Sequence, residues 1–205
     1  MPPTANLLEQ ISPPLRNLKV RDRVELAERP DLDEATLSQL CQDPSVRVRR
    51  AVAYRPQPFS PDIWKQFRVD LDTMKVLVQR PDCPTDLMQR WSDNPQITPL
   101  ILQRKHIPAE VQYHIYLFRG TDLPTLWDLA GRHDAPDDLL IELARNRSDW
   151  RLSTIVAENR HASAEVLQAI LRLPDGASTR NAKEAAVKHP NLPEHIRVLY
   201  AVGGE

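Results

Sequence analysis

Glycine, cysteine and aromatic residues are scarce in this chain of 205 residues. All 5 glycines lie beyond residue 119, and none forms a glycine-rich phosphate-binding loop. The two cysteines, Cys41 and Cys83, are too few for a disulfide framework or a cysteine metal site. The sequence contains no apolar run of signal-peptide or membrane-spanning length. We therefore expect a cytoplasmic protein with reduced thiols, no membrane association, no metal ion and no other cofactor.

An excess of charge of either sign is also missing. Lys and Arg number 27 against 28 for Asp and Glu, which leaves a formal net charge of -1. A dedicated nucleic-acid-binding protein usually has a basic excess, and this chain has none. The hydrophobic share of 41% and the charged share of 27% are typical of a soluble globular protein.

Proline, in contrast, is abundant, with 19 residues. Because glycine or serine tracts do not accompany them, these prolines indicate recurring helix boundaries and not a disordered linker. An arginine-proline pair recurs at positions 29, 55 and 80, and degraded forms continue the series at spacings of 24 to 30 residues. A period in this range predicts a solenoid, here of about seven repeats. We call the first residue of each pair the anchor residue of its repeat. The anchor residues are Arg29, Arg55, Arg80, Arg104, Arg132, Asn159 and His189.

Other columns of the alignment hold the same register. The residues two and three positions before each anchor residue are all apolar, as in Val52-Ala53 and Leu129-Ala130. Two further apolar columns follow each anchor residue. The first contains Leu37, Ile63, Leu87, Val111, Leu139, Val166 and Ile196, and the second, four residues later, contains Cys41, Phe67, Trp91, Ile115, Leu143, Ile170 and Tyr200. This periodicity predicts an all-α fold in which each repeat buries its apolar stripe against the next.

Each repeat is expected to consist of two short helices. The first, such as residues 46–55, ends at a proline, which cannot continue it. The second opens at a proline in its first turn or, in the sixth repeat, at Ser163 as a helix cap. The opening prolines are Pro61, Pro84, Pro108, Pro136 and Pro193.

Two segments carry a resemblance to a known family. "DPSVRVRRAVAYRPQPFSPDIWKQF", residues 43–67, and its echo "DNPQITPLILQRKHIPAEVQYHI", residues 93–115, resemble units of the leucine-rich repeat variant family. The resemblance covers residues 20–202 and implies a right-handed superhelix of HEAT-like helix pairs. Some family members carry a cysteine-rich iron–sulfur module, and this chain lacks the cysteines for one.

We expect a single domain, in which residues 1–19 form an N-terminal helical cap and residues 20–205 form the solenoid. The segment 171–181 lengthens one repeat to 30 residues and is predicted to be a surface loop or a flexible connection. At the other end, Ile196, Leu199 and Val202 lack a following repeat. Because terminal repeats normally need a polar outer face, we expect weak self-association or binding of a partner through this end.

The anchor arginines have two interpretations. In the first, they complement the dipole at the end of their own helix. In the second, they form an exposed arginine ladder that binds a partner, and exposed aromatic residues add contact area. The partner-binding residues predicted on this basis are Arg29, Arg47, Arg49, Tyr54, Arg80 and Trp127. Trp91 and Trp150 are instead predicted to be core residues.

Three functional hypotheses follow. The first is a non-enzymatic scaffold that binds a protein partner, since a stacked array exposes one long regular surface. The second is binding of a nucleic-acid backbone through the arginine ladder. The third, a DNA glycosylase built of HEAT-like repeats, rests on the adjacent Trp127 and Asp128 alone. No catalytic residues are predicted, because the six histidines are scattered and no catalytic motif is present.

Overall fold

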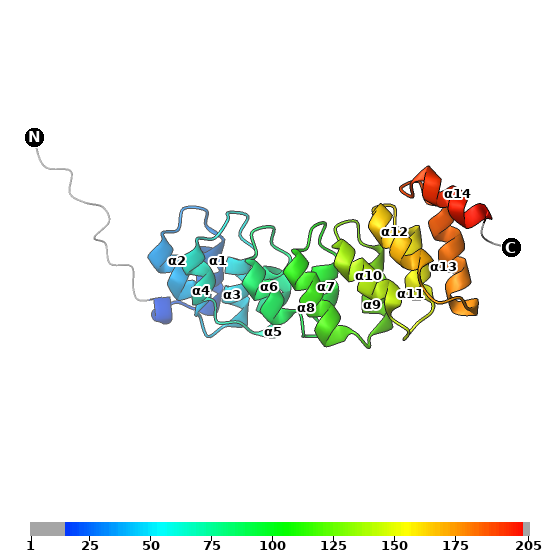
Figure 1. The fold of residues 1–205 in the computed structure, drawn as a ribbon. Coiled ribbons are helices and arrows are strands. Elements are labelled where there is room, and N and C mark those ends of the chain that lie inside the picture. The colour runs from blue at the N-terminus through cyan, green and yellow to red at the C-terminus, as the bar shows by residue number, and fades with distance from the viewer. Residues whose placement is uncertain (1–14, 203–205) are drawn as a thin grey trace, which may run out of the picture. The chain divides into compact units, whose positions relative to one another are not determined.

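The computed structural model describes residues 15–202 (Figure 1). Within that range, the regular structure consists of fourteen α-helices and one 3₁₀ helix, without a β-strand. The expectation of an all-α protein is therefore confirmed. No described helix has the length and apolar character needed to cross a membrane. The chain divides into two compact units, Met1–Cys83 and Pro84–Glu205, which are described separately below.

In the first unit, helices that are two apart in the chain pack side by side. α1, α3 and α5 form one row, α2 packs on α4, and α2 also contacts α1 and α3. The apolar core of this unit lies between these helices, where Leu40, Val52 and Leu77 are fully buried. The elements are η1 (Leu15–Asn17), α1 (Val20–Glu28), α2 (Glu34–Cys41), α3 (Val46–Ala53), α4 (Pro61–Gln66) and α5 (Leu71–Leu77).

The second unit repeats this pattern. α7, α9, α11 and α13 pack in sequence as one row, while α6 packs on α8 and α10 on α12. Leu126, Leu139, Leu143 and Leu152 are fully buried between the helices. The elements are α6 (Thr85–Trp91), α7 (Thr98–Leu102), α8 (Ala109–Arg119), α9 (Leu123–Gly131), α10 (Asp137–Arg145), α11 (Arg151–Glu158), α12 (Ala164–Leu171), α13 (Ala177–Lys188) and α14 (Glu194–Val202).

Proline and serine set the helix starts largely as predicted. Pro61 is the first residue of α4, and the Ser60 side chain before it accepts a hydrogen bond from the Ile63 N–H. Ser163 caps α12 in the same way through the Val166 N–H. Pro84, Pro108 and Pro136 lie one residue earlier than predicted, at the N-cap position with extended ψ. Proline fits this position too, because its fixed φ of about -65° is compatible with both extended and helical backbone. Pro193 likewise directly precedes Glu194, the first residue of α14.

Most of the predicted apolar columns are buried. Three departures occur in the columns that follow the anchor residues: Leu87 and Ile196 are only half-buried, and Tyr200 is 41% exposed. Met88, next to Leu87, is buried in its place. On α14, Val198 and Leu199 are exposed as well. Trp91 is buried as predicted, but the prediction for Trp150 is wrong, since 54% of this residue is exposed.

The two ends of the chain are described in part. Residues 1–14 of the expected N-terminal cap lie outside the described residues. The remainder contains the 3₁₀ turn η1, and the Leu18 carbonyl after it accepts a hydrogen bond of 2.6 Å from the buried Arg23. In segment 171–181, residues 177–181 are the first turns of α13, a helix of 12 residues where α11 has 8. The longer repeat is therefore accommodated partly by a longer helix.

Candidate functional site

The anchor residues Arg55 and Arg80 are buried between successive repeats. Arg55 Nη1 donates to the carbonyls of Ala27, at 2.8 Å, and Arg29 in the preceding repeat. One repeat later, Arg80 Nη1 donates to the carbonyls of Ala53, at 3.0 Å, and Arg55. Each guanidinium therefore binds the free carbonyls at the C-terminal end of the first helix of the preceding repeat, where a cation is favoured.

In the second unit, an arginine, an asparagine and a histidine at the anchor positions form hydrogen bonds to carbonyl groups of the preceding repeat. Arg132 Nη1 donates to the Leu102 carbonyl at 2.7 Å. Asn159 Nδ2 donates to the carbonyls of Ala130 and Arg132, both at 2.9 Å, and His189 Nε2 lies 3.1 Å from the Asn159 carbonyl. The anchor side chains therefore do bind carbonyl groups at a helix C-terminus, as the first interpretation predicts. The helix is, however, the first helix of the preceding repeat and not their own. The prediction that Arg80 lies on an exposed stripe is wrong, because 8% of it is exposed.

Arg49 is buried for a related reason. Its Nη1 donates to the carbonyls of Asp43 and Pro44, and its Nε lies 3.1 Å from Asp70 Oδ2. One repeat earlier, Arg23 pairs with Asp43 through Nε at 2.6 Å and Nη2 at 3.1 Å. These buried ion pairs join the first helices of neighbouring repeats, and the prediction of Arg49 as a surface residue is wrong. Arg49 lies between the exposed Arg47 and Arg50 in the sequence and is not apolar, so the apolar pattern did not mark its position as buried.

The remaining residues of the predicted stripe in the first unit are exposed. Arg47 and Arg50 lie on α3, and Tyr54 follows that helix with 64% of its surface exposed. Arg50 Nη2 is 3.5 Å from the Tyr54 hydroxyl. Arg29 is exposed and paired with Asp31 at 2.8 Å.

Trp127 is half-buried and has a structural role. Its Nε1 donates to Asp149 Oδ2 at 2.8 Å, and the Arg151 guanidinium lies over its ring, 4.3 Å from the centroid. Hydrogen bonds from Arg151 lower the pKa of Asp149 despite its burial. Trp127 therefore links α9 to the start of α11. The neighbouring Asp128 is exposed, so the pair that suggested a glycosylase does not converge on one site.

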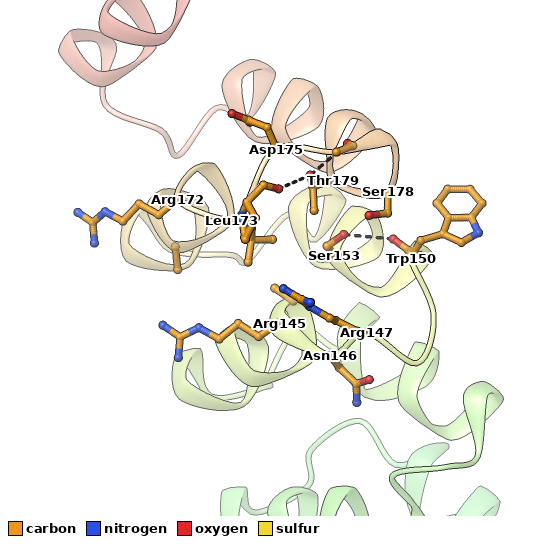
Figure 2. Close-up of a pocket in the computed structure, with 14 residues that line it drawn as sticks. Arg145, Asn146, Arg147, Trp150, Ser153, Arg172, Leu173, Asp175, Ser178 and Thr179 are labelled. Atoms are coloured by element: carbon orange, nitrogen blue, oxygen red, sulfur yellow. Dashed lines mark hydrogen bonds between the residues drawn. The ribbon is translucent and has the colours of Figure 1, made fainter.

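An arginine-lined pocket lies in the second unit, between the α10–α11 bend and the α12–α13 loop (Figure 2). Its cavity volume is about 620 Å³, which is in the range of ligand-binding pockets. Arg145 and Arg172 extend from the ends of α10 and α12 in the same direction, and Trp150 stands on the opposite side of the pocket (Figure 2). The other lining residues are Ala144, Asn146, Arg147, Ser153, Ala169, Leu173, Pro174, Asp175, Gly176, Ser178 and Thr179.

The charges around the pocket are mostly positive. Arg145 is paired loosely with Glu142, at 3.4 Å, and both side chains are more than half exposed. Among the described residues no carboxylate pairs with Arg147 or Arg172. Asp175, the one acidic residue of the lining, is paired with Lys183 at 2.5 Å. The pocket therefore offers guanidinium donors to an anionic ligand, and the N-terminal end of α13 adds its positive dipole to them.

Trp150 is exposed because of its place in the repeat. It is the residue before α11, with its carbonyl accepting a hydrogen bond from the Ser153 hydroxyl at 3.1 Å, so its ring is not on the helix face that packs against α9 and α13. This site is not among those predicted from the sequence. The signal was the run "ARNRSDWR", residues 144–151, followed by the lengthened repeat, in which arginine and tryptophan concentrate at one bend.

In comparisons with protein-family models, curated proteins and solved structures, nothing matches this chain. Its function is therefore inferred from the residues of the site.

Proposed function

We propose that this protein is a helical-repeat scaffold that binds an acidic segment of a protein partner in the arginine-lined pocket of its second unit. The observation that carries the proposal is the exposed Trp150 beside Arg145, Arg147 and Arg172 around one cavity. The scaffold is a solenoid of seven two-helix repeats, with the right-handed superhelix that the family resemblance implies. The repeated packing of alternate helices inside each unit and the recurring anchor bonds support this arrangement.

The chemistry of the pocket favours an extended acidic peptide. Arginine binds carboxylates through parallel N–H donors, and its hydrogen bonds to ionised groups are stronger than neutral ones. Trp150 and Leu173 supply the apolar contact that a peptide side chain needs, and tryptophan and arginine are the residues that dominate binding energy at protein interfaces. A segment that crosses the pocket from Trp150 toward Arg145 and Arg172 contacts both kinds of group.

Binding of a nucleic-acid backbone is the competing function. Three arginines and an aromatic ring also suit single-stranded nucleic acid. The protein partner is favoured because the formal net charge of -1 provides no long-range positive field for a polyanion, and because the buried anchor arginines Arg55 and Arg80 are not available to extend the positive surface.

The proposal is tested by panning a random peptide library, displayed on phage, against the full chain. We expect the enriched peptides to combine aspartate or glutamate with an apolar residue. A synthetic copy of an enriched peptide is then titrated by fluorescence anisotropy. Arg147→Glu and Trp150→Ala should each weaken its binding by about tenfold or more, the loss typical of a residue that dominates an interface.

Arg50→Glu, which reverses an exposed arginine in the first unit, is the matched control and should bind the peptide as the wild type does. Enrichment of peptides without acidic residues would overturn the proposal. Equal binding by Arg147→Glu and the wild type would overturn it as well. Binding of a single-stranded oligonucleotide that falls steeply with salt and is lost in Arg147→Glu would favour the nucleic-acid function.

A further inference from the structure

We infer that His106, His133 and Asp134 form a binding site for a divalent transition-metal ion, and we expect this ion to be Zn²⁺. His106 lies in the bend between α7 and α8, and His133 and Asp134 lie in the bend between α9 and α10. No metal site was predicted from the sequence, where His106 and His133 are 27 residues apart and match no ligand motif. Stacking of successive repeats in the second unit brings them together. This inference is independent of the proposed peptide-binding function.

The three side chains converge. One ligand atom from each lies within 4.8 Å of the others, and His106 Nδ1 is 4.0 Å from Asp134 Oδ2. The rings of His106 and His133 meet edge to face, with their centroids 5.3 Å apart. Ligand atoms on one tetrahedral zinc ion are about 3.3 Å apart, since each Zn–N bond is about 2.0–2.1 Å long. Both imidazoles are exposed, so rotation about their side-chain bonds closes the difference.

Asp134 is the fixed member of the set. Its carboxylate accepts hydrogen bonds from Arg132 Nε at 2.7 Å, from Arg132 Nη2 at 3.0 Å and from the Ile107 N–H at 2.7 Å. Its side chain is 15% exposed. Bonds of this kind orient a metal-binding carboxylate before the ion arrives. Arg132 is in turn fixed by its bonds to the carbonyls of Leu102 and Arg104.

The ligand types select the metal. Two imidazoles and one carboxylate suit Zn²⁺, Co²⁺ or Ni²⁺, whereas Ca²⁺ and Mg²⁺ require oxygen ligands. The positive charge of Arg132 beside Asp134 repels any cation. This repulsion further disfavours Ca²⁺ and Mg²⁺, which gain little from bonds to imidazole nitrogen. Three protein ligands leave a fourth position for water. The ring centroid of a third histidine, His161, lies 5.8 Å from that of His133, but His161 is not among the side chains whose ligand atoms converge.

The test uses the full chain without an affinity tag, after treatment with a chelator. Titration with CoCl₂ should produce the visible absorption of a tetrahedral Co²⁺ site at one equivalent, and ZnCl₂ should displace it. His106→Ala and His133→Ala should each weaken binding by at least about tenfold, since even outer hydrogen-bond partners of a metal ligand are worth this much. Their circular dichroism should match that of the wild type, because both rings are exposed.

Two further variants sharpen the result. His195→Ala removes an exposed histidine from α14, far along the chain from the site, and should leave the titration unchanged. His161→Ala should also leave it unchanged. A loss in His161→Ala as large as that in His133→Ala would overturn the assigned ligand set. No Co²⁺ spectrum from the wild type, or a spectrum that survives both His106→Ala and His133→Ala, would overturn the site itself.

Discussion

Arg29 and Arg55 occupy the same position in successive repeats, but their surroundings differ. Arg29 is exposed and pairs with Asp31, whereas Arg55 is 5% exposed and bonds to the carbonyls of Ala27, Arg29 and Pro30. Arg29 is the first anchor residue, so no described anchor residue precedes it. An arginine that satisfies buried carbonyls stabilises the fold, while an exposed pair in high dielectric contributes little. The role of each anchor residue therefore depends on the repeat before it.

We predict that Arg55→Ala destabilises the protein by about 2–4 kcal/mol, because it leaves carbonyl groups buried without donors. Urea denaturation followed by circular dichroism measures the change. Arg29→Ala, from the same column, is the control and should not move the urea midpoint. Equal midpoints for the two variants would show that the buried bonds of Arg55 do not contribute to stability.

The Cys41 thiol provides a second prediction at this scale. Burial raises its pKa to about 12, against a small opposing effect of the Arg55 charge. Since the thiolate is the reactive form, Cys41 should be inert to a disulfide reagent at pH 8 in the native protein and should react once urea unfolds the chain. Cys83 is buried too. Rapid native modification of Cys41, located by mass spectrometry, would contradict its burial.

At the scale of the element, short helices depend on their ends and on bonds to the next repeat. α5 has only seven residues, fewer than an isolated helix needs in water. Its N-cap residue, Asp70, accepts hydrogen bonds from the Thr73 N–H at 3.1 Å and the Thr73 hydroxyl at 2.8 Å, and pairs with Arg49 of α3. One carboxylate therefore begins the helix and joins it to its neighbour.

This arrangement predicts a pH dependence. Burial disfavours the charged carboxylate of Asp70, but the hydrogen bonds from Arg49 and Thr73 outweigh that effect, and its pKa is lowered. Because the folded pKa lies below the unfolded value of about 3.9, the ionised group stabilises the fold above about pH 4. This contribution is lost as the pH falls through the lowered folded pKa.

We therefore expect Asp70→Asn to destabilise the protein by about 1–3 kcal/mol at pH 7, the usual contribution of hydrogen bonds to a charged group. The difference from the wild type should shrink toward zero as the pH falls through the lowered folded pKa of Asp70. Urea midpoints across the pH range measure it. Asp72→Asn, an exposed acid on the same helix, should follow the wild-type curve, and a constant deficit of Asp70→Asn at every pH would contradict the linkage.

At the scale of the whole molecule, charge balance limits which partners the chain attracts. The formal net charge is -1. Several arginines are buried and form hydrogen bonds or ion pairs inside the protein, namely Arg23, Arg49, Arg55 and Arg80. Carboxylates and helix carbonyls compensate the free-energy cost of burying these charged side chains. The buried arginines therefore add no positive electrostatic field at the surface. Among the arginines that remain exposed are Arg47 and Arg50 on α3 and Arg145, Arg147 and Arg172 around the pocket of the second unit.

We predict that the full chain does not bind duplex or single-stranded oligonucleotides appreciably, even at low ionic strength. Fluorescence anisotropy with both probes measures this, with Arg47→Ala/Arg50→Ala as the variant that removes the exposed arginines of α3. Micromolar binding by the wild type that this double variant abolishes would contradict the prediction. A log–log salt slope near -0.9 per phosphate contact would identify the cause as backbone binding.

The repeat period, the all-helical fold and most core residues follow from the sequence alone, because helical periodicity and proline positions are local and recur in every repeat. Leu77, Trp91 and Leu143 are buried where their columns predict. Tertiary structure decided which arginines are available: Arg47 and Arg49 are two residues apart, yet one is exposed and the other is paired with Asp70 of the next repeat. It also decided both candidate sites. Trp150 borders a pocket, and His106 meets His133, because side chains about one repeat apart become neighbours only when the repeats stack, and the sequence period does not record which of them face each other.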